Sequence, residues 1–263
     1  MTILLHNKMP PPNEVIDIVK KKGFLICEDA IRSSNFESIQ RYWINRFKQL
    51  NNSDLPKYDR SPKYLLGQEN FSAIEDKKKE YRVKIQEFLW NDIHYDTREL
   101  LIEMQKFTNL CLKRNSYDGL LYHQNKNALS LSVNYYPPNK GRLTAHKDSK
   151  DTDLYLWMIF NLTFKGDHFN DGGLYLIDEE NKKIDLDKLS TPSSVIFFNG
   201  MLEHGVDLIK SENGLGKISV FPFNTYYETS DTIPKYVKLL LNINNKIRSK
   251  LLSQKKEKKG LKN

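Results

Sequence analysis

Three residues of this chain have side chains and a spacing suited to holding a metal ion: His146, Asp148 and His204. In an extended strand, successive side chains point to opposite faces, so His146 and Asp148 are expected to project from the same face. An imidazole and a carboxylate so placed can occupy two adjacent positions around one ion. His204, 58 residues further along, can fill a third position and leave the others open, as in non-heme Fe(II) sites.

The second half of the chain has the pattern of antiparallel β structure. From Ala128 the hydrophobic period becomes strand-like, and Pro-, Gly- and Asn-rich turn signals separate the segments. The predicted strands cover residues 129–136, 143–146, 154–164, 173–177, 194–198, 206–209 and 217–223. Many short strands at near-regular spacing favour a sandwich or barrel, and the cupin-like jelly roll, a double-stranded β-helix, fits best.

One predicted strand has two faces of different character. Between residues 154 and 163, one alternating set is wholly apolar, whereas the other mixes aromatic and polar residues, including Tyr155, Trp157 and Asn161. The first face is expected in the core, and the second is typical of a pocket wall.

Helices are predicted on both sides of this core. A short helix over 14–19, with Asn13 as its N-cap and Gly23 at its end, precedes a strand over 24–27. Longer helical patterns cover 34–50, 71–90 and 92–114, and the loop 51–70 could form part of a substrate lid. The prediction is one domain over 1–252, with a helical part (1–127), a jelly-roll core (128–230), a C-terminal helix (231–252), and a basic, disordered tail (253–263).

Composition and charge narrow the kinds of partner. No segment approaches the ~18 apolar residues of a membrane span, and two cysteines, Cys27 and Cys111, indicate a reduced, cytoplasmic protein. The net charge is +8, but residues 235–263 hold ten basic residues and one acid, which leaves −1 for residues 1–234. Because no aromatic residue is interleaved with the basic residues after Tyr236, a nucleic-acid partner is not expected.

The ordered set of motifs resembles the Fe(II)- and 2-oxoglutarate-dependent oxygenases, in their isopenicillin-N-synthase-like, plant-type branch. The segment 134–138, Asn-Tyr-Tyr-Pro-Pro, is similar to the Asn-Tyr-Tyr-Pro segment ahead of the metal motif in that branch. His146-Lys147-Asp148 matches the HxD pair, 171–174 (Asp-Gly-Gly-Leu) resembles a common strand start, and His204 matches the distal ligand. The match spans about residues 128–223.

The resemblance implies a hydroxylase-type dioxygenase with Fe(II), 2-oxoglutarate and O2. The cosubstrate would bind the metal through its C1 carboxylate and keto oxygen, and the reaction would release succinate and CO2. Relatives that halogenate lack the carboxylate found here at Asp148, so its presence implies hydroxylation, or a desaturation or cyclisation.

The resemblance also implies a cation for the far carboxylate of 2-oxoglutarate. Most of that branch has arginine followed two residues later by serine, whereas this chain has Lys217-Ile218-Ser219. Lysine is a compact point charge and does not offer the bidentate fork of arginine. Lys217 and Ser219 share a strand face, and the phenol of Tyr136 would bind the same carboxylate, while Asn134 would meet the C1 end.

Arg142 is an alternative cation. If its strand is regular, Arg142 shares a face with Thr144 and His146 and could bind the cosubstrate or an acidic group of the substrate.

Three functional hypotheses stay open at this stage. The first is an oxygenase that acts on a small molecule, such as an amino acid or a specialised metabolite in a biosynthetic pathway. The second is an oxygenase that modifies a protein or nucleic acid, and the third is a cupin that binds metal without redox chemistry. The substrate and the oligomeric state do not follow from the sequence.

Overall fold

The structure is a computed structural model that describes most of the chain between residues 8 and 229. It describes residues 3, 8–49, 65–66, 70–76, 80–89, 91, 93–120, 127–148, 154–212, 214–226 and 228–229. The predicted C-terminal helix over 231–252, the basic tail over 253–263 and most of the predicted loop 51–70 lie outside these residues.

Three helices precede the main sheet strands, close to where they were predicted: α1 (Pro12–Lys22), α2 (Ser33–Lys48) and α3 (Tyr95–Cys111). The first begins two residues earlier than predicted, because Pro12 occupies its first turn, where a missing N–H costs nothing. Gly23 ends this helix in the left-handed conformation, at φ 82°, and β1 (Phe24–Cys27) follows as predicted.

The predicted helix over 71–90 is wrong: this segment is a hairpin of β3 (Asn70–Asp76) and β4 (Glu80–Phe88). In β4, Val83 and Ile85 are buried in the main core, and the polar residues between them lie on the other face. This period of two decides the structure, because only a strand can place such alternate residues on one side.

The remaining elements are strands and one short helix. They are β2 (Leu65–Leu66), β5 (Asn127–Tyr136), β6 (Arg142–His146), β7 (Leu156–Asn161), β8 (Asp171–Ile177), β9 (Lys183–Asp185), α4 (Leu186–Leu189), β10 (Val195–Asn199), β11 (His204–Lys210), β12 (Lys217–Tyr226) and β13 (Glu228–Thr229). Each of the seven strands predicted after residue 128 is present with shifted ends, whereas β9 and α4 were not predicted.

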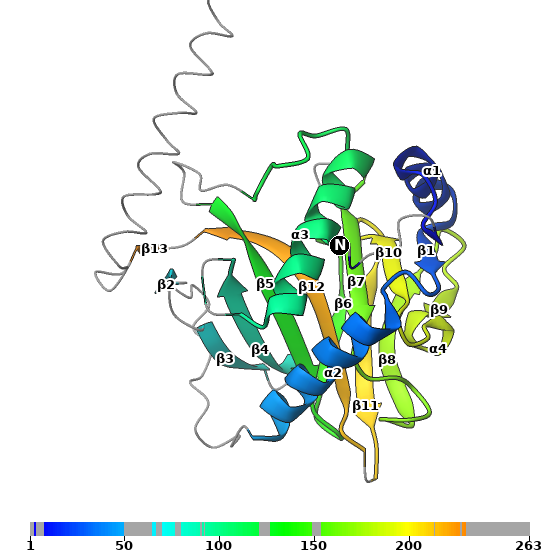
Figure 1. Ribbon diagram of the computed structural model, residues 1–263. Coiled ribbons are helices and arrows are strands. Elements are labelled where there is room, and N and C mark those ends of the chain that lie inside the picture. The colour runs from blue at the N-terminus through cyan, green and yellow to red at the C-terminus, as the bar shows by residue number, and fades with distance from the viewer. Residues whose placement is uncertain are drawn as a thin grey trace, which may run out of the picture.

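The main sheet is curled and antiparallel, with the order β1-β10-β7-β12-β5-β4-β6-β11-β8-β9 and with β3 paired to β4, whereas β2 and β13 form a separate two-stranded sheet. Strand β4 pairs with both β5 and β6, and thereby joins the half that begins at β1 to the half that ends at β9. The sheet bends around this junction into a half-barrel (Figure 1), which confirms the predicted jelly roll.

Two hydrophobic cores hold this arrangement. The first lies between the helices and the outer face of the larger half, where α2 and α3 cover the sheet (Figure 1). The second lies inside the curl. Strand β7 contributes to both, since Met158 and Phe160 belong to the first core, whereas Trp157 and Ile159 face the second, as its two-faced pattern predicted.

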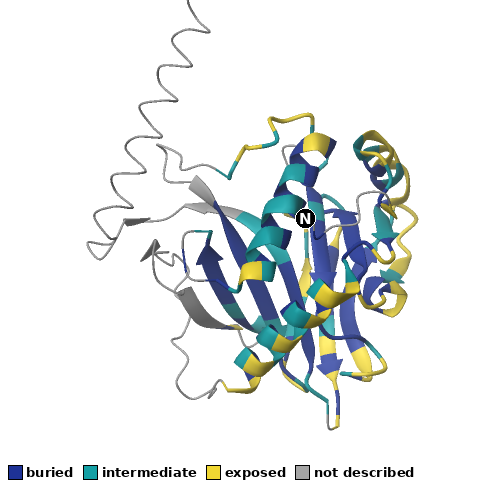
Figure 2. Ribbon diagram, in the orientation of Figure 1, coloured by how far each residue is buried: buried dark blue, intermediate teal, exposed yellow. Residues whose placement is uncertain are grey.

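Burial follows these layers, with exposed residues gathered on the outer sides of α1 and α2 (Figure 2). Among the helices in the described part of the chain, none combines the length and the apolar character needed to cross a membrane.

Candidate metal centre

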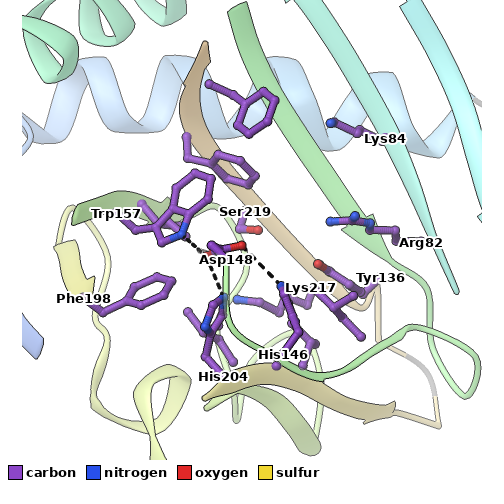
Figure 3. Close-up of a pocket in the computed structure, with 17 residues that line it drawn as sticks. Arg82, Lys84, Tyr136, His146, Asp148, Trp157, Phe198, His204, Lys217 and Ser219 are labelled. Carbon is purple, nitrogen blue, oxygen red and sulfur yellow. Dashed lines mark hydrogen bonds and ion pairs between the residues drawn. The ribbon is translucent and has the colours of Figure 1, made fainter. Parts of the chain in front are cut away.

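The inner side of the curl brings together the three predicted metal ligands. His146 ends β6 and His204 begins β11, and the two residues are direct cross-strand partners. Asp148 follows two residues after His146, and one ligand atom from each of the three side chains lies within 4.8 Å of the others. The Nε2 atom of His204 is 3.2 Å from Asp148 Oδ2, and that of His146 is 3.6 Å from Asp148 Oδ1 (Figure 3).

Backbone carbonyls fix the orientation of both imidazoles. His146 Nδ1 lies 3.0 Å from the carbonyl oxygen of Thr144, and His204 Nδ1 lies 3.0 Å from that of Leu202. A carbonyl oxygen can only accept, so each Nδ1 donates and each Nε2 directs a lone pair toward the Asp148 carboxylate. Three acceptors then meet at one point, which only a cation or added protons can stabilise.

A divalent metal ion fits this donor set. Two neutral imidazoles and one carboxylate are the ligands of mononuclear Fe(II) centres that keep open positions. Adjacent ligand atoms around an ion with bonds of about 2.1 Å are separated by about 3 Å, close to the contacts that Asp148 makes here. The carbonyl partner of each Nδ1 is the usual outer support of a metal-bound histidine.

The protonation of the centre agrees with metal binding. Burial alone would raise the pKa of Asp148, but when protons occupy the two Nε2 atoms, hydrogen bonds from His146 and His204, together with that from Trp157, outweigh burial and hold that pKa well below its usual range. The hydrogen bond with Asp148 raises the pKa of His146, against the opposing effect of burial. The carboxylate therefore stays ionised, as a metal ligand must.

Trp157 and Gly200 hold Asp148 in place. The indole Nε1–H of Trp157 donates to Asp148 Oδ2, and the backbone N–H of Asp148 donates to the Gly200 carbonyl at 2.9 Å. A Cβ atom at Gly200 would lie only 2.5 Å from Asp148 Oδ2 and 2.7 Å from Trp157 Nε1. The sequence indicated Trp157 only as part of a pocket wall and Gly200 only as a turn residue.

The metal centre opens into a cavity of about 240 Å³ inside the curl. One part of its lining is aromatic, from Trp157, Phe198, Phe221 and Phe223. Another part is cationic, from Arg82, Lys84 and Lys217. Figure 3 shows Trp157 and Phe198 across the cavity from Arg82 and Lys84, with the three ligands between them.

Lys217 faces the cavity as predicted, but it is already engaged. Its Nζ donates to Asp187 Oδ1 and to Asn161 Oδ1, each at 2.7 Å, and the Lys217 and Asp187 side chains are both only 1% exposed. Ser219 lies on the same face and is the cross-strand partner of Asn134. Asp187 comes from α4, which is four residues long and gave no sequence signal.

Arg82 is the functional candidate that the sequence prediction missed. Its Nη1 donates to Asn134 Oδ1 at 3.4 Å, and its Nη2 lies 3.5 Å from Glu80 Oε2. Burial raises the pKa of Tyr136, whereas the charge of Arg82 and its hydrogen bond to the phenol lower it. Arg82 thus contacts both Asn134 and Tyr136, and it was missed because a helix was predicted over 71–90.

The condition for the Arg142 alternative, a regular strand, is not met in β6. His204 pairs with His146, and Val206 pairs with Leu143, so two steps along β11 match three steps along β6. This bulge changes which alternate residues face inward. Leu143 therefore lines the cavity with His146, and Arg142 is not among the lining residues.

Within the described part of the chain, the His146–Asp148–His204 cluster is the only group of three or more His, Cys, Asp or Glu side chains whose ligand atoms lie close enough to hold one metal ion. His94 stacks on Tyr42 at a centroid distance of 4.6 Å, and His168 Nδ1 accepts the backbone N–H of Phe164 at 3.2 Å. These two imidazoles have structural contacts of their own.

In sequence, the chain matches no protein-family model and no curated protein. In structure, it is similar to a prolyl-4-hydroxylase from Pseudomonas putida, with a TM-score of 0.55 and 12% identity over 82% of this chain and 100% of that one. A prolyl hydroxylase from Trichoplax adhaerens (TM-score 0.46, 14% identity, 81% of this chain and 88% of that one) and EctD from S. alaskensis (TM-score 0.48, 14% identity, 86% and 81%) are also similar. The likeness to the Pseudomonas structure shows that the two chains share a fold.

Proposed function

We propose that this protein is an Fe(II)- and 2-oxoglutarate-dependent oxygenase that hydroxylates a small molecule. The observation that carries the proposal is the convergence of His146, Asp148 and His204 at one point of the inner wall, with both Nε2 atoms directed at the carboxylate. The double-stranded β-helix and the cation-lined cavity beside the centre support it.

In this proposal the three ligands hold Fe(II) on one side and leave its other side to the cavity. With Fe(II), 2-oxoglutarate and O2 bound, such a centre couples oxidative decarboxylation of the cosubstrate to oxidation of a C–H bond. The protein fixes the ligand geometry: carbonyls orient the imidazoles, and Trp157 orients the carboxylate. The presence of Asp148 favours hydroxylation, or a desaturation or cyclisation, over halogenation.

The far carboxylate of 2-oxoglutarate is assigned to the wall formed by Tyr136, Lys217 and Ser219, with Arg82 beside the Tyr136 phenol. Asp187 already accepts a hydrogen bond from Lys217, so this lysine carries little net attraction for a second anion. Arg82 offers the planar fork that suits a carboxylate. We therefore expect Arg82 to contribute more than Lys217, and the C1 end to lie toward Asn134.

Separate variants measure the two contributions. In Arg82→Met, the KM for 2-oxoglutarate is expected to rise at least tenfold, on the scale of a lost charge-assisted hydrogen bond of about 1.5–3 kcal/mol, and in Lys217→Met it is expected to rise less. Arg142→Met is the control, because Arg142 does not line the cavity. A rise in KM in the Arg142 variant alone would contradict the assignment.

A small substrate is favoured by the size of the cavity, about 240 Å³. The test is succinate formation by the purified protein with Fe(II), 2-oxoglutarate, ascorbate and a panel of metabolites, with Asp148→Ala as the inactive control. Metal binding without succinate would instead support a cupin without redox chemistry. Deleting residues 253–263 tests a tail-guided protein or nucleic-acid substrate, and unchanged turnover would count against it.

A further inference from the structure

We propose that Lys84 and the Phe223 ring form an anion-binding position on the substrate side of the cavity, so that the substrate is an acidic molecule with a flat apolar part. The word substrate here rests on the proposed oxygenase function. The binding position itself rests on the arrangement of four side chains, Lys84, Phe223, Trp157 and Asp148.

Strand β4 places Lys84 inside the curl. Lys84 is the cross-strand partner of Asn134, which pairs with Ser219, which in turn pairs with Asn161. Lys84 and Ser219 both line the cavity. The Lys84 ammonium lies 5.0 Å from the centre of the Phe223 ring.

An unbroken row of contacts leads from this ammonium to the metal ligands. Phe223 is stacked nearly parallel on Trp157, with a centroid distance of 6.1 Å and an interplanar angle of 7°. Trp157 donates its indole N–H to Asp148. Phe221 stands edge-on to the same indole at 5.0 Å. A molecule whose apolar part lies along this row, with its acid group at Lys84, has its remaining atoms beside the metal centre.

This position differs from the one assigned to 2-oxoglutarate. Lys217 donates to Asp187 and Asn161, and Arg82 contacts Asn134 and Tyr136, whereas Lys84 lies over an aromatic ring. Lys84 and Arg82 are two residues apart on β4, which separates their Cα atoms by roughly 6.6 Å. Figure 3 shows Lys84 further from the histidine ligands than Arg82 along the same side of the cavity.

The electrostatics of Lys84 favour an anionic ligand. Burial, with repulsion from Arg82, lowers the pKa of Lys84 to about 7, against the opposing attraction of Glu80. A desolvated ammonium gains more from an anion than an exposed one does, because water no longer competes. An acid that binds at pH 8 should therefore raise the pKa of Lys84 and take up a proton.

A matched pair of probes tests the charge requirement. The protein is saturated with Zn(II) and 2-oxoglutarate, so that the metal-side positions are occupied, and is titrated calorimetrically at pH 6.5 with 3-phenylpropanoate and with 3-phenylpropanamide. The wild type is expected to bind the acid about tenfold or more tightly than the amide, on the scale of a charge-assisted hydrogen bond.

Three variants decide whether Lys84 causes this preference. The preference for the acid over the amide should fall below about twofold in Lys84→Met and should remain in Lys84→Arg, which keeps a charge. Lys106→Met is the matched control, because Lys106 also lies over an aromatic ring, Tyr117, at 5.5 Å, but outside the cavity. Equal affinities in the wild type, or a preference retained in Lys84→Met, would overturn the proposal.

The two proposals fail separately. Succinate release reports on the oxygenase function, whereas the preference for acid over amide is measured without turnover. If the protein prefers the acid but makes no succinate, the proposed anion-binding position is supported and the proposed oxygenase function is contradicted.

Discussion

Two polar clusters on the wall of the same cavity differ in how their charges are balanced. Around Lys217, one ammonium donates to Asp187 and to Asn161, and the two opposite charges cancel inside the protein. Around Asp148, two imidazole lone pairs face a carboxylate, so that acceptor meets acceptor.

This difference separates a structural cluster from a binding centre. The Lys217 cluster satisfies its own hydrogen bonds and needs nothing added, so its main effect is on folding stability. The Asp148 cluster gains stability only when a cation enters, so its main effect is on metal binding. The interacting polar atoms lie 2.7 Å apart in the Lys217 cluster and 3.2 to 3.6 Å apart in the Asp148 cluster.

The most complete loss of function is expected in His204→Ala, which should no longer bind the metal. In the wild type, Zn(II) at about 100 times its Kd should stabilise the folded state by about 2.7 kcal/mol. His204→Ala should show no such stabilisation and no succinate formation, because one of three ligands is gone. Thermal unfolding with and without Zn(II) measures this, with His94→Ala as the control. Zn(II) stabilisation that persists in His204→Ala would show that the metal binds elsewhere.

Breaking the balanced cluster should lower the free energy of unfolding by about 3–5 kcal/mol, since removal of one partner leaves a buried charge. Lys217→Met is therefore expected to be strongly destabilised in urea unfolding, and Lys217→Met combined with Asp187→Leu should recover part of the loss. The exposed pair Lys183–Asp207, with contacts of 2.6 Å, is the control, and Lys183→Met should cost at most about 1 kcal/mol. Equal losses in Lys217→Met and Lys183→Met would show that the Lys217 cluster contributes no more to folding stability than an exposed ion pair does.

Removing the support of Asp148 should weaken the centre without abolishing it. Trp157→Phe keeps an aromatic ring but loses the indole hydrogen bond, and metal affinity is expected to fall about 10- to 100-fold, as for other outer-shell partners. Calorimetric titration with Zn(II) measures the change. Trp43→Phe is the matched control, because the Trp43 indole donates to Thr97 at 3.1 Å in the helical layer. An unchanged affinity in Trp157→Phe would show that the ligand geometry does not depend on Trp157.

The smallest effect concerns the ammonium of Lys84, which is partly buried and has a pKa of about 7, below the ordinary value of lysine. Between pH 7 and 10, the unfolded chain binds more protons at this residue than the folded protein does, so stability should rise with pH. The rise contributed by Lys84 is at most about 1.4 kcal/mol per pH unit. Urea unfolding at pH 7 and pH 9 should show a larger gain in the wild type than in Lys84→Met. If the free energy of unfolding changed equally with pH in the wild type and in Lys84→Met, the Lys84 ammonium would be exposed to solvent.

Several parts of this protein follow from local patterns in the sequence. The period of two along β5, β7 and β12 predicted strands and their inward faces, because alternation depends only on neighbouring residues. The HxD spacing likewise predicted that His146 and Asp148 act together. Strand β4 was missed although it alternates, because a helix was predicted over 71–90, across the charged residues 75–80.

Other features depend on contacts between distant segments. The pairing of β6 with β11 creates the bulge that turns Leu143 inward in place of Arg142. The position of α4 brings Asp187 to Lys217, and the hairpin β3–β4 brings Arg82 to Tyr136.

The sequence by itself therefore determined the chemical identity of the metal ligands, most of the strands and the jelly-roll fold. Only the tertiary structure decided which cations face the cavity and which of them are already neutralised. The physical reason is that alternation and turn chemistry act over a few residues, whereas register, bulges and charge pairing are fixed when strands far apart in the chain meet.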